Sequence, residues 1–173
     1  LKLLPQGSLL PLVLILRAVE AGHQWPSPLL HSRAHLLSKN PNDLYSPLEY
    51  RFLLLTPTLY RVWAKLRLAH LQTWADRWIK PRMYGGVAKV GAADAWYTAS
   101  LQIEHSLVSG NPVVGAVLDL FKCIDQVIRP LLYTLLAMSG FPPALLSAYI
   151  NFMECSVIHN SVAGSLGRPH QHR

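Results

Sequence analysis

One aspartate of this chain follows a short apolar run, and this position suits a metal ligand. Asp119 follows the run 113–118, and Lys122 and Asp125 come three and six residues later. An acidic side chain at the end of a strand lies at the edge of a sheet, where its oxygens can bind a metal ion. Aspartate also commonly caps the helix that follows it, and for Asp125 this is the better interpretation. For Asp119 the spacing leaves both roles open.

Basic side chains gather in the middle of the chain, and they are candidates for binding phosphate. The formal net charge is +7, which attracts polyanions, of which nucleic acid is the commonest. Guanidinium groups bind phosphate oxygens in pairs, although the same residues could form the wet face of an ordinary amphipathic helix. The candidates are Arg51, Arg61, Lys65 and Arg67. Lys122 is equally well explained as a phosphate ligand or as a solvated residue at a helix start.

The composition predicts a folded chain with a sizeable core. Of the 173 residues 51% are hydrophobic and only 14% are charged, which argues against disorder and fits one domain, or one and part of another. The two cysteines, Cys123 and Cys155, form no disulfide framework, which favours a reducing compartment. No Ser-His-Asp set, phosphate-binding P-loop or dinucleotide fingerprint is present. We also expect the chain to be a piece of a longer protein, because it starts at Leu1 and ends in a polar stretch.

The most apolar run, 9–16, is expected to form a buried helix rather than a membrane anchor. It is eight residues long and contains Pro11, so it is too short to span a bilayer and makes a poor signal peptide. We therefore expect an intracellular protein, in the nucleus or the cytoplasm, with no membrane partner.

Hydrophobic periodicity and turn signals predict the helices and strands that position these residues. We expect helices at 9–22, 59–78, 92–108, 126–139 and 143–153. Strands are expected at 34–39, 50–55, 113–118 and 155–162, with residues 164–167 as the turn of a hairpin whose return strand is missing. The fold class is α+β. The tryptophans fall at helical spacing, and we expect Trp63, Trp74, Trp78 and Trp96 in the core.

The segment that begins at Asp119 resembles a catalytic motif. It reads D-L-F-K-C-I-D-Q-V-I-R-P-L-L, similar to the D-x-x-K-A-F-D-x-V-x-R-x-x-L of non-LTR (LINE-type) retrotransposon reverse transcriptases. Residues 140–143, G-F-P-P, resemble the family's G-(L/F/I)-P helix break. Upstream, residues 49–53 are similar to the Y-R-P-I segment of the fingers, and 59–67 fit the helix after it.

Three further segments add to the resemblance. Residues 84–95 are similar to the family's G-F-x-x-G-R-x-x-x-D-A segment, and Trp25-Pro26 and 36–39 resemble its W-P and L-x-K signals. Each motif is weak alone, but together they stand in the family's order from about residue 20 to the end. This order favours the metal role for Asp119.

The resemblance implies an RNA-directed DNA polymerase with a right-hand fold. Residues 1–112 would belong to the fingers, and 113–173 to a partial palm, an incomplete ferredoxin-like sheet with packed helices. The reaction is template-directed nucleotidyl transfer from a dNTP to a DNA primer on an RNA template, with two Mg²⁺ ions about 3.5–4 Å apart. Asp119 would bind both ions, helped by the Leu120 carbonyl, and the basic group would clamp a triphosphate and the template backbone.

The chain also departs from the family pattern. Ile124 stands at the sugar-gate position, where the family usually has an aromatic residue, and Phe52 replaces the proline of Y-R-P-I. Ala92 replaces the arginine of G-R, and the sequence contains no Asp-Asp pair. We therefore expect no polymerase activity from this chain alone. Two alternatives are a non-catalytic nucleic-acid-binding remnant and a helical interaction protein with a chance motif.

Overall fold

The chain forms two compact units. The computed structural model describes residues 5–40, 49–120, 123, 126–162 and 165–171. Unit 1 comprises Leu1–Leu71 and Arg129–Arg173, and unit 2 comprises Gln72–Ile128. These units are defined by packing, whereas the expected division into 1–112 and 113–173 is one of function and stays a prediction.

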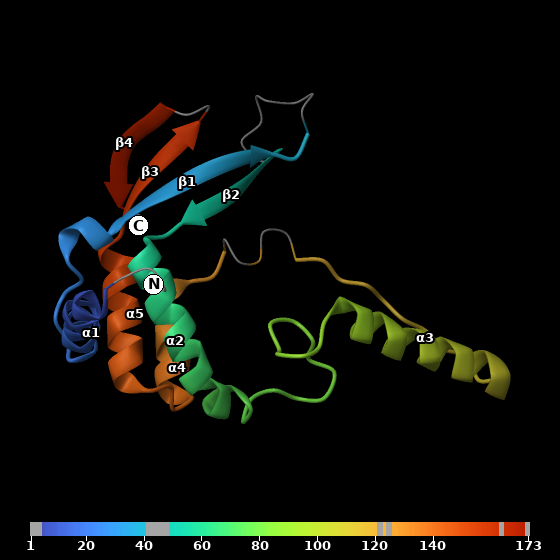
Figure 1. The fold of residues 1–173 in the computed structure, drawn as a ribbon. Coiled ribbons are helices and arrows are strands. Elements are labelled where there is room, and N and C mark those ends of the chain that lie inside the picture. Colours follow the sequence, from blue (N-terminus) through green and yellow to red (C-terminus); the bar gives the residue numbers. More distant parts are fainter. Residues whose placement is uncertain (1–4, 41–48, 121–122, 124–125, 163–164, 172–173) are drawn as a thin grey trace. The chain divides into compact units, whose positions relative to one another are not determined.

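Unit 1 contains a mixed four-stranded sheet. Its strands are β1 (His31–Ser38), β2 (Tyr50–Leu55), β3 (Val157–Val162) and β4 (Ser165–Gln171), in the order β2-β1-β3-β4. β1 pairs antiparallel with β2 and parallel with β3, and β3 pairs antiparallel with β4 (Figure 1). β2 has the predicted bounds. β4 corrects the expectation that the hairpin after β3 lacks its return strand.

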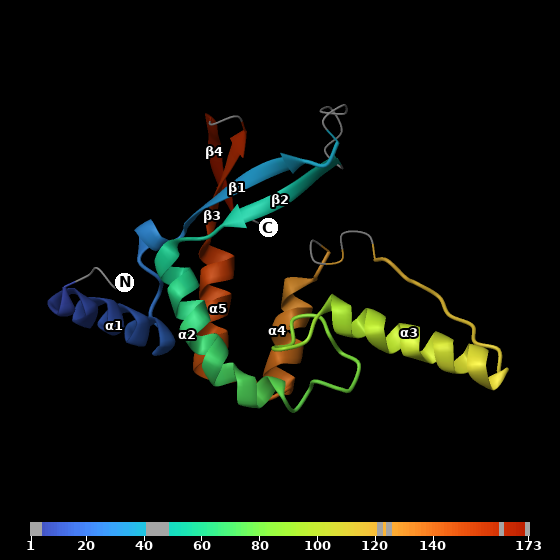
Figure 2. The same ribbon diagram turned by 45° about the vertical axis from the view of Figure 1, so that its right-hand side comes forward.

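The helices of unit 1 extend from one end of this sheet, so the fold class is α+β, as predicted. They are α1 (Gln6–Glu20), α2 (Thr58–Ala75), which continues into unit 2, α4 (Arg129–Met138) and α5 (Pro143–Cys155). A short 3-10 helix, Ser27–Leu29, precedes β1. α5 packs against both α1 and α4, and the two views show α2 beside α5 (Figures 1 and 2).

An aromatic core lies among α1, α2 and α5. Trp25, Trp63 and Phe152 are buried, and Tyr60 stacks on Phe152 with the ring centroids 3.5 Å apart. Trp25 meets the Trp63 and Phe152 rings edge-on, at 5.5 and 5.7 Å. The indole Nε1 of Trp25 donates a hydrogen bond of 2.9 Å to the Ala148 carbonyl. Because this donor is satisfied, the large ring can be buried without leaving a polar group unpaired.

The turn between α4 and α5 confirms the helix break predicted at 140–143. Gly140, two residues after the end of α4, has a φ of +74°, the left-handed conformation that glycine adopts most readily. The Phe141 N–H donates to the Leu136 carbonyl at 3.1 Å and so closes the end of α4. Pro142 and Pro143 then start α5, because a proline at the first helical position loses no hydrogen bond.

Unit 2 contains α3 (Ala92–Ser109) and an extended segment, residues 111–120. The Asp94 carboxylate accepts a 2.8 Å hydrogen bond from the Gly91 N–H at the start of α3, and Gly110 ends the helix at a φ of +69°. The strand predicted at 113–118 is wrong, because residues 111–120 form neither helix nor strand. An apolar run becomes a strand only when another strand satisfies its N–H and C=O groups, and no described strand pairs with this run.

Two predictions about burial are also wrong. α1 forms where a helix was expected, but Leu10 and Leu14 are exposed, because the helix buries only the side that carries Val19. Trp63 lies in the core as predicted, whereas Trp78 and Trp96 are exposed. In the described part of the chain, no helix combines the length and the hydropathy needed to cross a bilayer.

Candidate functional site

Asp119 lies at the end of the extended segment and is exposed, as is Leu120 beside it. Lys122, Ile124 and Asp125 lie outside the described residues. Among the residues that the structure describes, no group of three or more His, Cys, Asp or Glu could hold a metal ion. Because a two-magnesium centre needs several carboxylates, Asp119 and its described neighbours do not form one.

The basic candidates belong to unit 1, whereas Asp119 belongs to unit 2. Arg51 lies on β2 and is exposed. Arg61 and Lys65 are exposed on α2, and their spacing of four residues places them on one face of the helix. The Arg61 guanidinium donates a 3.2 Å hydrogen bond to the Thr58 hydroxyl, which leaves its charge unneutralised. This pair on α2 is able to bind phosphate oxygens.

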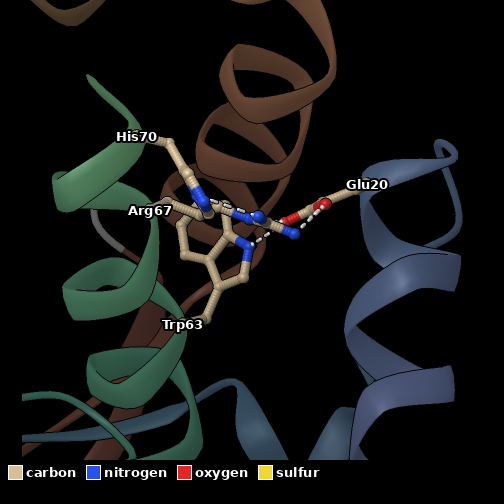
Figure 3. A network of polar contacts seen from close by, with 4 residues as sticks. All are labelled: Glu20, Trp63, Arg67 and His70. Carbon is tan, nitrogen blue, oxygen red and sulfur yellow. Dashed lines mark hydrogen bonds and ion pairs between the residues drawn. The ribbon is translucent and has the colours of Figure 1, made fainter. Parts of the chain in front are cut away.

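Arg67 differs from the other basic candidates because it binds a carboxylate of the same chain. Its guanidinium forms a two-point contact with Glu20 of α1, with Nε–Oε1 and Nη2–Oε2 distances of 2.5 and 2.7 Å. The Trp63 indole Nε1 donates to Glu20 Oε1 at 2.7 Å, and His70 Nδ1 lies 3.1 Å from Arg67 Nη1 (Figure 3). This network of four residues joins α1 to α2.

The Glu20 network stabilises unit 1 more than an ordinary surface ion pair does. The side chains of Arg67 and Glu20 are only 30% and 16% exposed, so solvent screens their attraction incompletely. Both carboxylate oxygens accept charge-assisted hydrogen bonds, which are stronger than neutral ones. A phosphate must therefore compete with Glu20 for Arg67, and the role of Arg67 as a phosphate ligand stays a prediction.

A second polar contact joins α4 to α5 and was not anticipated from the sequence. Arg129 donates to the Met153 carbonyl at 3.2 Å and forms an ion pair of the same length with Glu154. The Tyr133 hydroxyl donates to Glu154 at 2.7 Å. Burial, together with this hydrogen bond, raises the pKa of Tyr133 above its ordinary value. Arg129 belongs to the segment that resembles the catalytic motif, and here it closes the end of α5.

A surface pocket runs along α5, and none of the predicted site residues lines it. Its volume is about 470 Å³, and its lining residues are Pro143, Leu146, Ser147, Ile150, Asn151 and Cys155. The Asn151 Oδ1 atom is buried without a hydrogen-bond partner. The pocket walls are mostly apolar and carry no ionisable group besides Cys155, so they suggest no reaction.

The sheet holds a pair of histidines that the sequence interpretation did not single out. His31 Nδ1 on β1 lies 3.0 Å from His159 Nε2 on β3, and the ring centroids are 5.3 Å apart. The signal was the alternation His31-x-Arg33-x-His35, which has the period of a strand. It was missed because the strand was expected to begin at residue 34, whereas β1 begins at His31.

No protein-family model matches the chain, and no curated protein matches its sequence significantly. The function must therefore be argued from the order of its motifs and from the geometry of its own side chains.

Proposed function

We propose that the chain is part of the RNA-directed DNA polymerase of a non-LTR retrotransposon. In this proposal residues 1–112 belong to the fingers and 113–173 to the first part of the palm of a right-hand polymerase. The observation that carries it is the order of the motifs, from Trp25-Pro26 through the D-x-x-K segment at Asp119 to the G-F-P-P break. The exposed cations of β2 and α2 support it, because a polymerase must hold a triphosphate and a template backbone.

The proposed roles follow from side-chain chemistry. Arg51, Arg61 and Lys65 bind phosphate oxygens of the nucleotide or the RNA template, with Lys122 as a further candidate. Ile124 lies at the sugar-gate position. In the complete enzyme Asp119 and the Leu120 carbonyl would contribute ligands to Mg²⁺, which would supply charge stabilisation for the nucleotidyl transfer. Because the sequence contains no Asp-Asp pair, we expect no nucleotidyl transfer from the 173-residue chain.

A second candidate function is nucleic-acid binding without catalysis. The net charge of +7 and the exposed cations on α2 favour it, and it needs no metal centre. Its signature is an affinity that falls steeply as the salt concentration rises, because bound cations release counterions from the phosphates.

The coding DNA downstream of Arg173 tests the polymerase proposal. We expect it to encode the family's P-Q-G and A-D-D motifs in that order, in the same frame or after a frameshift. The protein extended through these motifs should elongate a DNA primer on an RNA template with Mg²⁺, and Asp119→Asn should reduce the incorporation to background. Asp76→Asn is the matched control, because Asp76 is exposed, accepts a 2.7 Å hydrogen bond from Gln72 of the preceding turn and lies outside every motif.

Two results would contradict the polymerase proposal. One is downstream coding DNA that is unrelated to polymerases. The other is an extended protein whose activity survives Asp119→Asn, because a metal ligand cannot be replaced by an amide without loss of charge. Incorporation by the 173-residue chain itself would contradict the narrower expectation that this chain is inactive alone.

A further inference from the structure

One face of the sheet collects imidazole and guanidinium groups. Along the start of β1 the burial alternates: His31 and Arg33 are exposed, whereas Ser32 and Ala34 are fully buried. Because successive side chains of a strand point to opposite faces, His31, Arg33 and His35 share the face away from the buried side. We call this face the outer face.

The register extends the outer face over the neighbouring strands. On β3, His159 pairs in register with Arg33 and contacts His31. On β2, Arg51 pairs with Leu37, which has the same parity as Arg33 and therefore lies on the same face. Opposite Arg33 and His35 on β2 are two exposed leucines, Leu55 and Leu53.

The charged side chains of the outer face are all basic. The four strands contain three arginines and four histidines, and no aspartate or glutamate. Arg33 and Arg51 are both exposed. The described ion pairs of the protein are formed by Arg67 and Arg129, so neither ion pair includes a residue of the outer face. An anion that approaches the face meets no carboxylate of the sheet.

The mixture of groups suits a single-stranded nucleic acid better than other anions. Unpaired bases stack on imidazole rings and on guanidinium planes, and their phosphates bind the same guanidinium groups. His31 and His159 already lie side by side, tilted by 30°, and offer ring surface at the centre of the sheet. Leu53 and Leu55 add apolar contact area beside Arg33. In a duplex the base faces are covered, so rings and leucines would contribute little.

We propose that the outer face, formed by His31, Arg33, His35, Arg51 and His159, binds single-stranded nucleic acid. The bases contact the histidine pair and the leucines of β2, while Arg33 and Arg51 bind phosphates. The site requires only the described sheet of unit 1. It therefore does not depend on the polymerase proposal, with which it shares Arg51 alone, and it survives if that proposal fails.

Fluorescence anisotropy of a labelled 12-nucleotide RNA of mixed sequence, titrated with the full chain, tests this site. We expect Arg33→Gln/Arg51→Gln to weaken binding about tenfold and to reduce the slope of log K against log salt by about 1.4, since each phosphate contact contributes roughly 0.7 on a single strand. His31→Ala/His159→Ala should weaken binding by about tenfold as well, through lost stacking. Far-UV circular dichroism and thermal unfolding establish that each variant is folded.

The matched control is Arg77→Gln/Arg82→Gln, which removes the same charge from exposed positions outside the sheet. It should change the affinity by less than about threefold, because neither position belongs to the outer face and a lower net charge alone has a small effect in salt. Equal losses in the control and in Arg33→Gln/Arg51→Gln would overturn the proposal. So would equal affinity for the same RNA annealed to its complement. Displacement of the RNA by phosphatidylserine vesicles at low lipid concentration would assign the face to membranes instead and overturn it too.

Discussion

Unit 1 and unit 2 differ in what holds their elements together. Unit 1 buries Trp25, Trp63 and Phe152 in one aromatic core, and polar contacts join α1 to α2 and α4 to α5. In the described part of unit 2 no residue is buried; α3 has a hydrogen bond at its start, and Thr98 within it bonds to the Tyr84 hydroxyl at 2.9 Å. α3 therefore forms without a buried core around it, whereas the segment with Asp119 needs a partner strand to become part of a sheet.

Truncating the core should give the largest effect. Phe152→Ala removes a ring that is 1% exposed and stacks on Tyr60, so we expect the free energy of unfolding to fall by about 3–5 kcal/mol. Trp96→Ala on α3 is the control from unit 2, because this ring is 70% exposed, and it should cost no more than about 0.5 kcal/mol. Urea denaturation followed by circular dichroism measures both.

A loss of this size can unfold a marginal protein, so Phe152→Leu serves as a milder variant that keeps most of the volume. It should fall between the wild type and Phe152→Ala. Similar losses for Phe152→Ala and Trp96→Ala would remove the contrast between the two units.

Breaking the Glu20 network should have a smaller effect. Glu20→Gln removes the charge that accepts three hydrogen bonds from Arg67 and Trp63, and we expect a loss of about 1–3 kcal/mol. Glu104→Gln on α3 changes the same charge at an exposed position and should cost no more than about 0.5 kcal/mol. Chemical denaturation at low and moderate salt checks both variants. If Glu20→Gln is neutral, the contact between α1 and α2 rests on apolar packing alone.

The smallest of the three expected changes in stability comes from the partly buried Tyr60 at alkaline pH. Burial raises the pKa of Tyr60 above the value of about 10 of an exposed tyrosine. Above pH 10 the unfolded chain therefore loses this proton before the folded chain does, and stability falls as the pH rises. Between pH 10 and 11 we expect Tyr60 to contribute a loss of about 1 kcal/mol.

Tyr60→Phe should remove this part of the alkaline loss, whereas Tyr97→Phe, at an exposed ring of α3, should leave it in place. Urea midpoints at pH 9 and pH 11 measure the difference. Identical pH dependence in the wild type and in Tyr60→Phe would show that the Tyr60 hydroxyl reaches water in the folded protein.

The sequence predicted those elements of the fold whose signals are local. β2 was predicted residue for residue, and the break at Gly140 followed from glycine and proline. The strand at 113–118 failed because pairing depends on a distant segment, which periodicity does not report. β4 was missed because Gly167 and Pro169 argue against a strand, although an edge strand tolerates proline.

The candidate site was harder to predict for the same reason. The basic residues were found by type, but Arg67 differs from Arg61 through Glu20, which lies 47 positions away in the sequence. The histidine pair joins residues 128 positions apart. The first contact depends on how α1 packs beside α2, and the second depends on how β1 and β3 align, for which a single sequence carries no local signal.

β2 is an edge strand of the sheet. Phe52, Leu53, Leu54 and Leu55 are all exposed on this short strand, and within the described sheet β1 is its one neighbour. An edge strand rich in apolar residues is a template on which a second copy of the chain can add its own strand. Mutual repulsion from the +7 charge opposes such growth at low ionic strength. Concentrated protein in high salt should therefore assemble first through the edge strand β2.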